Sequence, residues 1–184
     1  PLHSSNNITV QESRKVMFSL LDNAKSLGVT DIVIPCVDQS TLDSQEVADR
    51  FVENLTPMVE IAEKYGINLS LETDLAPQSF VELLDRFNSS RVTVNYDIGN
   101  SAALGFDSNE ELSTYGYRIT DVHIKDRMLA GESVTLGEGN ADFSKFFDKL
   151  KEFNYQGPFI MQTYRDDEGV EVFKKQLDWI NKWV

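Results

Sequence analysis

The stretch INLSLETDLAPQSFVELLDRFNSSRVTVNYD (residues 67–97) contains two apolar runs separated by a helical pattern. The runs at 67–72 and 91–97 have the length and apolar content of buried strands. Between them, Pro77 suits the first turn of a helix that we expect to continue to about Phe87. A strand, a helix and a second strand in this order predict a parallel strand pair joined by a right-handed crossover.

The same alternation extends in both directions along the chain. Helical patterns are found at 10–27, 44–65, 77–87, about 108–116, 142–153 and 168–183. Parallel strands are predicted at about 31–36, 67–72, 91–97, 119–125 and 158–163. One helix followed by five βα units predicts an α/β fold in which helices cover a parallel sheet. Such a sheet is either doubly wound or part of a (β/α)8 TIM barrel.

The positions of glycines and polar residues favour the barrel. A doubly wound sheet carries a glycine-rich phosphate loop early in the chain, whereas the candidate GEGNAD (137–142) comes late and lacks the third glycine. We interpret this segment as a glycine turn in which Asp142 caps the following helix. A barrel instead gathers functional residues at the C-terminal ends of several strands, and polar residues stand at those positions in this sequence.

Composition and charge limit the possible partners. The 184 residues, 41% of them hydrophobic, suit a single domain spanning 1–184. A formal charge of −13 excludes nucleic acid and anionic membranes as expected partners. The single Cys36, the polar start of the chain and the absence of a long apolar run predict a cytoplasmic protein.

Four polar residues stand late in successive predicted strands: Glu72, Asp97, His123 and Gln162. In a barrel, side chains at these positions can point into one mouth. Their mixed nitrogen and oxygen donors suit Mn²⁺, Mg²⁺ or Co²⁺, and Zn²⁺ less well. A metal there could polarise a sugar carbonyl while a carboxylate moves a proton. Helix caps, ion pairs and a hydrogen-bonded core histidine are the alternative interpretation of the same residues.

Several motifs resemble those of the xylose isomerase-like TIM barrels, which comprise sugar and sugar-phosphate isomerases and epimerases, with the endonuclease IV group as distant relatives. The segments that carry the resemblance are LSLETD (69–74), YDIGNSAALG (96–105), DVHIKDR (121–127), LGEGNADF (136–143) and GPFIMQ (157–162). The resemblance implies four metal ligands, namely Glu72, Asp97, His123 and Gln162. It also implies Glu72 as the catalytic base and a substrate-binding set of Asn100, Lys125 and Arg127.

The sequence departs from this family in two respects. Position 162 is Gln where the family has Glu, and an amide oxygen can bind a metal but cannot act as a base. The chain also holds five βα units, whereas a complete barrel has eight and about 250 residues. The resemblance aligns residues 31–36 with the fourth strand, so the chain is expected to be a partial barrel lacking about three N-terminal units. Open sheet edges predict self-association, unless the chain is a piece of a longer enzyme.

The leading functional prediction is a metal-dependent sugar or sugar-phosphate isomerase or epimerase that transfers a proton through an enediolate. Two alternatives stay open: a sugar or polyol dehydratase of the same superfamily, and a catalytically impaired fragment that serves as a binding or assembly module. A phosphodiesterase is disfavoured because its metal cluster is rich in histidine, and this chain contains His3 and His123 alone.

Overall fold

The computed structural model describes residues 1–165, 167 and 169–184. Strands and helices alternate as predicted, and they form two compact units, residues 1–94 and 95–184. Strand β3 (Val92–Asp97) begins in the first unit and ends in the second. The prediction of a single domain over 1–184 stays a prediction.

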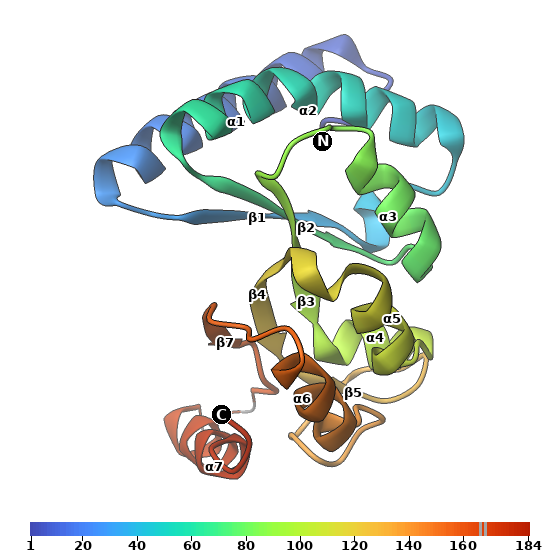
Figure 1. The fold of residues 1–184 in the computed structure, drawn as a ribbon, viewed down its shortest axis with the longest axis vertical. Helices are drawn as coiled ribbons and strands as arrows, with labels where there is room; N and C mark the ends of the chain where they lie inside the picture. Colours follow the sequence, from blue (N-terminus) through green and yellow to red (C-terminus); the bar gives the residue numbers. More distant parts are fainter. Residues whose placement is uncertain (166, 168) are drawn as a thin grey trace. The chain divides into compact units, whose positions relative to one another are not determined.

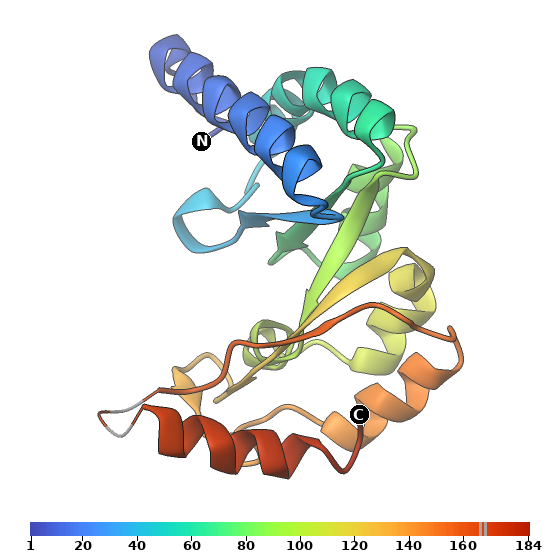
Figure 2. The same ribbon diagram turned by 90° about the vertical axis from the view of Figure 1, so that its left-hand side faces the viewer.

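The first unit contains three parallel strands and three helices. Its elements are α1 (Asn7–Leu27), β1 (Asp31–Cys36), the 3-10 turn η1 (Asp38–Ser40), α2 (Gln45–Tyr65), β2 (Asn68–Thr73), α3 (Pro77–Asp85) and the start of β3. β2 pairs in parallel with β1, with Glu72 opposite Pro35, and with β3, with Leu71 opposite Val94. Helices α1 and α2 lie along the same face of β1 and β2 (Figures 1 and 2).

Local sequence explains where these helices begin and end. The Asn6 side chain accepts hydrogen bonds from the first backbone N–H groups of α1, and Ser44 caps α2 in the same way. Gly28 and Gly66 follow the two helices with φ values of 70° and 72°, a left-handed conformation that glycine adopts without strain. The apolar stripe of α2, which includes the fully buried Leu55, packs into the core of this unit.

In its described residues, the second unit contains the end of β3, two further parallel strands, a short hairpin and four helices. Its elements are α4 (Ile98–Leu104), α5 (Ser108–Tyr115), the 3-10 turn η2 (Gly116–Arg118), β4 (Ile119–Ile124), β5 (Asp126–Arg127), β6 (Ser133–Val134), α6 (Phe143–Lys151), β7 (Phe159–Met161) and α7 (Val170–Ile180). β4 and β7 are parallel, with Val122 opposite Phe159, and β5 and β6 form an antiparallel pair.

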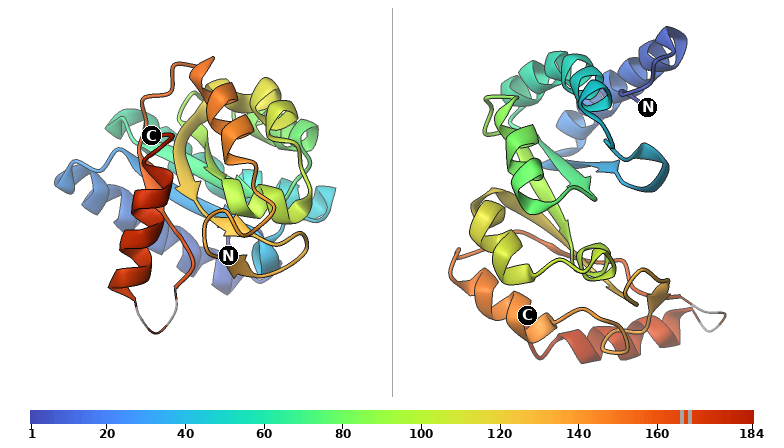
Figure 3. Two further views of the ribbon diagram at one scale, coloured as in Figure 1. Left: turned by 90° about the horizontal axis from the view of Figure 1, so that it is seen from below. Right: turned by 90° about the vertical axis from the view of Figure 1, so that its right-hand side faces the viewer.

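Aromatic side chains hold the helices of this unit together. Helices α5 and α6 lie side by side (Figure 3), and the Tyr96 ring of β3 stacks on Phe146 of α6 with centroids 4.9 Å apart. Phe143 packs edge-on against Trp179 of α7 at 5.0 Å, with Trp183 beside both. The apolar stripe of α6 lies in the core, as expected of residues at helical spacing: Phe143, Phe146, Phe147 and Leu150.

Several predicted element ends differ from the structure, and three of them concern strands that carry candidate site residues. The last strand is Phe159–Met161 rather than 158–163, so Gln162 follows the strand instead of lying within it. β4 ends at Ile124, which leaves Lys125 just outside it. β2 runs one residue further than expected, to Thr73. Helix α4 and the β5–β6 hairpin were not predicted. Within the described residues, none of the helices has the length and apolarity needed to cross a bilayer.

Candidate metal centre

Asp97 ends β3 and starts α4, and its two carboxylate oxygens have different surroundings. Oδ1 accepts a hydrogen bond from the Asn100 backbone N–H at 2.8 Å and so caps α4. Oδ2 is buried and has no hydrogen-bond donor among the residues that the structure describes. Because burial of an unsatisfied carboxylate oxygen is costly, Oδ2 has the character of an atom that faces a cation.

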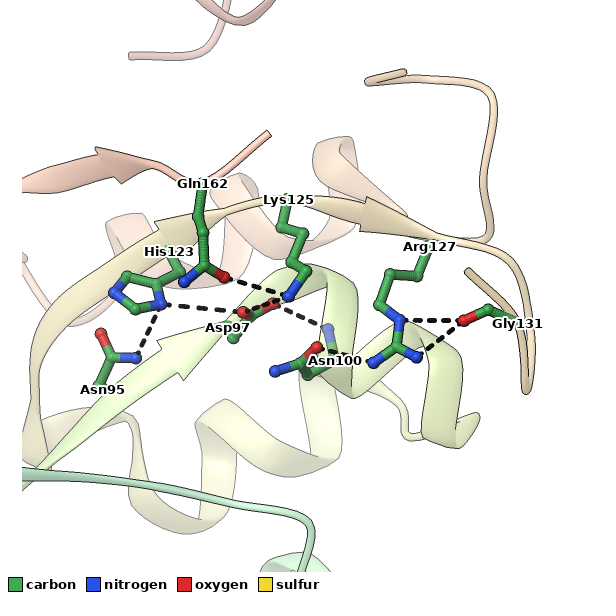
Figure 4. A network of polar contacts seen from close by, with 8 residues as sticks. All are labelled: Asn95, Asp97, Asn100, His123, Lys125, Arg127, Gly131 and Gln162. Atoms are coloured by element: carbon green, nitrogen blue, oxygen red, sulfur yellow. Dashed lines mark hydrogen bonds and ion pairs between the residues drawn. The ribbon is translucent and has the colours of Figure 1, made fainter. Parts of the chain in front are cut away.

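Two nitrogen atoms lie near that oxygen. His123 Nδ1 is 3.8 Å and Lys125 Nζ is 3.5 Å from Asp97 Oδ2 (Figure 4). Asn95 lies on the same face of β3 as Asp97, and its amide Nδ2 is 3.2 Å from His123 Nδ1. An imidazole nitrogen and a carboxylate oxygen this close form a mixed donor pair of the kind that binds first-row divalent metals.

Lys125 links this pair to the end of β7. Its Nζ donates a hydrogen bond to Gln162 Oε1 at 3.1 Å, and its side chain is 17% exposed. The backbone N–H of Gln162 in turn donates to Ile124 O at 3.0 Å, which fixes the residue beside β4. The aliphatic stem of Lys125 lies over Gly99, where an added Cβ would come within 2.8 Å of Lys125 Cγ. Gly99, two residues after Asp97, therefore leaves the space through which the Lys125 side chain reaches Asp97.

Asn100 and Arg127 form a second polar pair next to this group. Arg127 Nη1 donates to Asn100 Oδ1 at 2.9 Å, while Nε and Nη2 donate to the carbonyl oxygen of Gly131 at 3.0 and 2.8 Å. These bonds hold the guanidinium against the start of α4 (Figure 4). The structure thus brings six of the predicted site residues together within the second unit: Asp97, Asn100, His123, Lys125, Arg127 and Gln162.

Asp126 is a residue whose role the sequence did not reveal. It is fully buried, and its carboxylate accepts backbone hydrogen bonds from Gly137, Gly139 and Ala141 at 2.9, 3.0 and 3.1 Å. A Cβ at Gly139 would lie 2.2 Å from Asp126 Oδ1, so only glycine fits there. The 137–142 segment is therefore a loop built around Asp126, and Asp142 caps α6 at its end, as predicted.

Glu72 belongs to the first unit, where it lies near the C-terminal end of β2 and is buried. Cys36 ends the neighbouring strand β1. Burial, reinforced by the carboxylates of Asp74 and Glu72, raises the pKa of the Cys36 thiol to about 12. Because thiolate is the form that binds metal and attacks electrophiles, this thiol is not suited to either role at neutral pH. The predicted ligand and base roles of Glu72 stay predictions.

Asn95 is a further residue that sequence reasoning missed. It lies inside a run of buried strand residues, and its contact with His123 depends on the pairing of two strands that the sequence alone does not align. A polar residue two positions before a candidate ligand on the same strand face is the signal that could have identified it.

Parallel strands alternating with helices, with carboxylate and imidazole groups at strand ends, define an α/β protein of the barrel type. The chain belongs to the xylose isomerase-like TIM barrel family, whose model matches residues 1–183. The match confirms the predicted family and fold class.

Two curated relatives illustrate the similarity. An uncharacterized protein of Methanocaldococcus jannaschii is 30% identical over 153 residues, which cover 76% of this chain and 52% of that protein. The L-ribulose-5-phosphate 3-epimerase UlaE of Escherichia coli is 28% identical over 190 residues, 98% of this chain and 66% of the enzyme. The chain thus spans about half to two thirds of the length of these relatives.

A solved structure agrees on the fold. The IolI protein, crystallised with a bound zinc atom, superimposes with a TM-score of 0.81 at 21% identity, over 98% of this chain and 73% of that one. At this identity the likeness concerns the fold alone.

Proposed function

We propose that this protein is a divalent-metal-dependent isomerase or epimerase of sugars or sugar phosphates. The observation that carries the proposal is the buried Asp97 Oδ2, which has no hydrogen-bond donor in the described chain and faces His123 Nδ1 at 3.8 Å. Similarity to an L-ribulose-5-phosphate 3-epimerase supports the substrate class.

The residues present fit a metal ion. Asp97 and His123 would hold it, and by family resemblance we assign Glu72 and the Gln162 amide oxygen as further ligands. A bound divalent ion would polarise a sugar carbonyl and its neighbouring hydroxyl, which would make the proton on the hydroxyl-bearing carbon more acidic. The identity of the metal among Mn²⁺, Mg²⁺, Co²⁺ and Zn²⁺ is left to experiment, because the donors suit several of these ions.

The chain's own residues would bind the sugar and move the proton. Glu72 is the proposed base that takes the proton and returns it to the sugar. Lys125 can stabilise the negative charge that develops on oxygen, since its ammonium already lies 3.5 Å from Asp97 Oδ2. Arg127 and Asn100 would contact the far end of the substrate, where the guanidinium could bind a phosphate.

Gln162 influences which reaction is favoured. With one carboxylate base, the proton can return to the adjacent carbon, which gives aldose–ketose isomerisation. Inversion at a single carbon needs a second proton donor on the opposite face of the substrate, and a glutamine amide cannot fill that role. The same argument supports a dehydratase as the second candidate, because elimination of water from a sugar or polyol needs one base and a metal.

Metal binding and product analysis together test the proposal. Calorimetric titration with Mn²⁺ is expected to show binding to the wild type and to His3→Ala, and loss of binding in His123→Ala. His3 lies in the polar N-terminal segment and is the matched control for removal of one imidazole. Absence of binding in the wild type, or equal binding in both variants, would refute the metal site.

The reaction itself can be followed by proton NMR in D₂O with a panel of ketopentoses and their 5-phosphates. Deuterium at the carbon next to the carbonyl together with an aldose product indicates isomerisation, and a C3 epimer indicates epimerisation. A 3-deoxy dicarbonyl product would instead support the dehydratase. If metal binds but no sugar is exchanged or converted, the binding-module alternative is the better account.

A further inference from the structure

Glu111 is a buried carboxylate that lies behind the candidate metal centre. It belongs to α5, and its side chain is 3% exposed. Three hydroxyl groups donate to it: Tyr96 OH at 2.7 Å and Ser101 Oγ to Oε2, and Tyr115 OH to Oε1 at 2.8 Å. The carboxylate thereby joins β3, α4 and α5, which are neighbours in the second unit (Figure 1).

These hydrogen bonds involve residues before and after Asp97 in the sequence, but none of them is made by the Asp97 carboxylate. Side chains alternate across a strand, so Tyr96 points away from the face that carries Asn95 and Asp97. Ser101 lies on α4, the helix that Asp97 caps. Glu111 therefore fixes the residue before Asp97 and the helix after it, from the side opposite to His123.

Burying the Glu111 carboxylate costs desolvation free energy, which indicates that its hydrogen bonds serve a purpose besides stability. Burial raises the pKa of its carboxyl group, and the three hydroxyl donors oppose that rise. Apolar side chains in place of the carboxylate and its hydroxyl donors together would avoid this desolvation, and such replacement of all the partners is often neutral or stabilising. A buried carboxylate with three oriented donors instead gives a defined geometry.

We infer that Glu111 is a positioning residue for Asp97, a role that rests on the metal site proposed above. By holding Tyr96 and Ser101 together, it sets α4 against the end of β3. In that arrangement Asn100 N–H meets Asp97 Oδ1 and leaves Oδ2 turned toward His123. Groups hydrogen-bonded directly to a metal ligand typically change metal affinity about 10- to 100-fold when they are removed. Glu111 acts through Tyr96 and Ser101, so we expect an effect at the lower end of that range.

Three variants test this role. Glu111→Leu fills the space but removes the acceptor, and Glu111→Gln keeps one carbonyl oxygen for the hydroxyl groups. Phe147→Leu is the destabilised control, because Phe147 is buried against Phe159 and Trp183 and reaches Tyr96 only through the ring of Phe146. Each protein is compared at temperatures equally far below its own Tm, so that general loss of stability affects all of them alike.

Two readouts are measured. The first needs no metal: hydrogen exchange of the Asn100 amide should become faster in Glu111→Leu, remain close to wild type in Glu111→Gln, and be unchanged in Phe147→Leu. The second is Mn²⁺ affinity, which should fall about tenfold or more in Glu111→Leu, with partial recovery in Glu111→Gln.

The outcomes separate this inference from the proposed function. Equal exchange rates and equal Mn²⁺ affinities in Glu111→Leu and the control would overturn the positioning role while the metal site stands. If the wild type binds no Mn²⁺, both proposals fail, whatever the exchange rates. If exchange is faster but Mn²⁺ affinity is unchanged, Glu111 shapes α4 without serving the site, and the inference is again wrong.

Discussion

Lys125 should compete with a divalent ion for Asp97. Its ammonium lies 3.5 Å from Asp97 Oδ2, and the two side chains are 17% and 1% exposed. For unit charges at that separation, Coulomb's law gives an attraction of about 1 kcal/mol in water and about 5 kcal/mol at an effective dielectric constant of about 20. A metal must overcome part of this attraction to use the same oxygen, and Lys125→Met removes it.

We therefore expect Lys125→Met to bind Mn²⁺ more tightly than the wild type. A gain of about 1.4 kcal/mol corresponds to a tenfold change, and this value lies within the lower part of the Coulomb range above. Calorimetric titration at fixed ionic strength measures the affinity. Lys151→Met is the matched control, since it removes the same charge from the same unit at a side chain that is 68% exposed. An affinity of Lys125→Met that is no higher than that of the control would refute the competition.

Three other changes have defined outcomes. Gln162→Glu should restore a second carboxylate beside Lys125 and raise Mn²⁺ affinity in calorimetry; unchanged or weaker binding would exclude position 162 from the site. Gly139→Ala should lower the free energy of unfolding by about 1–3 kcal/mol, measured by urea titration, because its Cβ would overlap the Asp126 carboxylate; a wild-type midpoint would contradict the packing described. The Cys36 thiol, with its pKa raised to about 12, should resist thiol reagents at pH 8 until the chain unfolds. The unfolded thiol loses its proton near pH 9, whereas the folded thiol keeps it up to about pH 12. The contribution of the Cys36 thiol to the free energy of unfolding is therefore present below about pH 9 and declines between about pH 9 and 12. Cys36→Ala should lack this decline of stability with pH.

The strands were predictable because each is a short apolar run bounded by residues that break regular structure. The meeting of Asp97 and His123 followed from the same pattern, since parallel strands place their C-terminal ends at one edge. The distance between the two side chains and the lack of a hydrogen-bond donor to Asp97 Oδ2 could not be predicted, because both depend on which way the Asp97 carboxylate turns when it caps α4.

The missed elements share a physical cause. Helix α4 contains Gly99, Asn100 and Ser101, which are weak helix formers, and it forms because Asp97 caps it and Glu111 holds Ser101. In the sequence Glu111 looks like an ordinary exposed charge in the first turn of a helix. Only its tertiary partners show that it is buried. Self-association and a cytoplasmic location stay predictions, and sedimentation velocity would test the first of them.

The loop around Asp126 limits how this protein could recognise phosphate. The backbone N–H groups of Gly137, Gly139 and Ala141 converge as they would around a bound anion, yet the anion they hold is the chain's own carboxylate. A phosphate group could not bind to these three N–H groups without displacing the Asp126 carboxylate. A phosphate bound by this protein would therefore have to meet donors outside this loop, such as the guanidinium of Arg127.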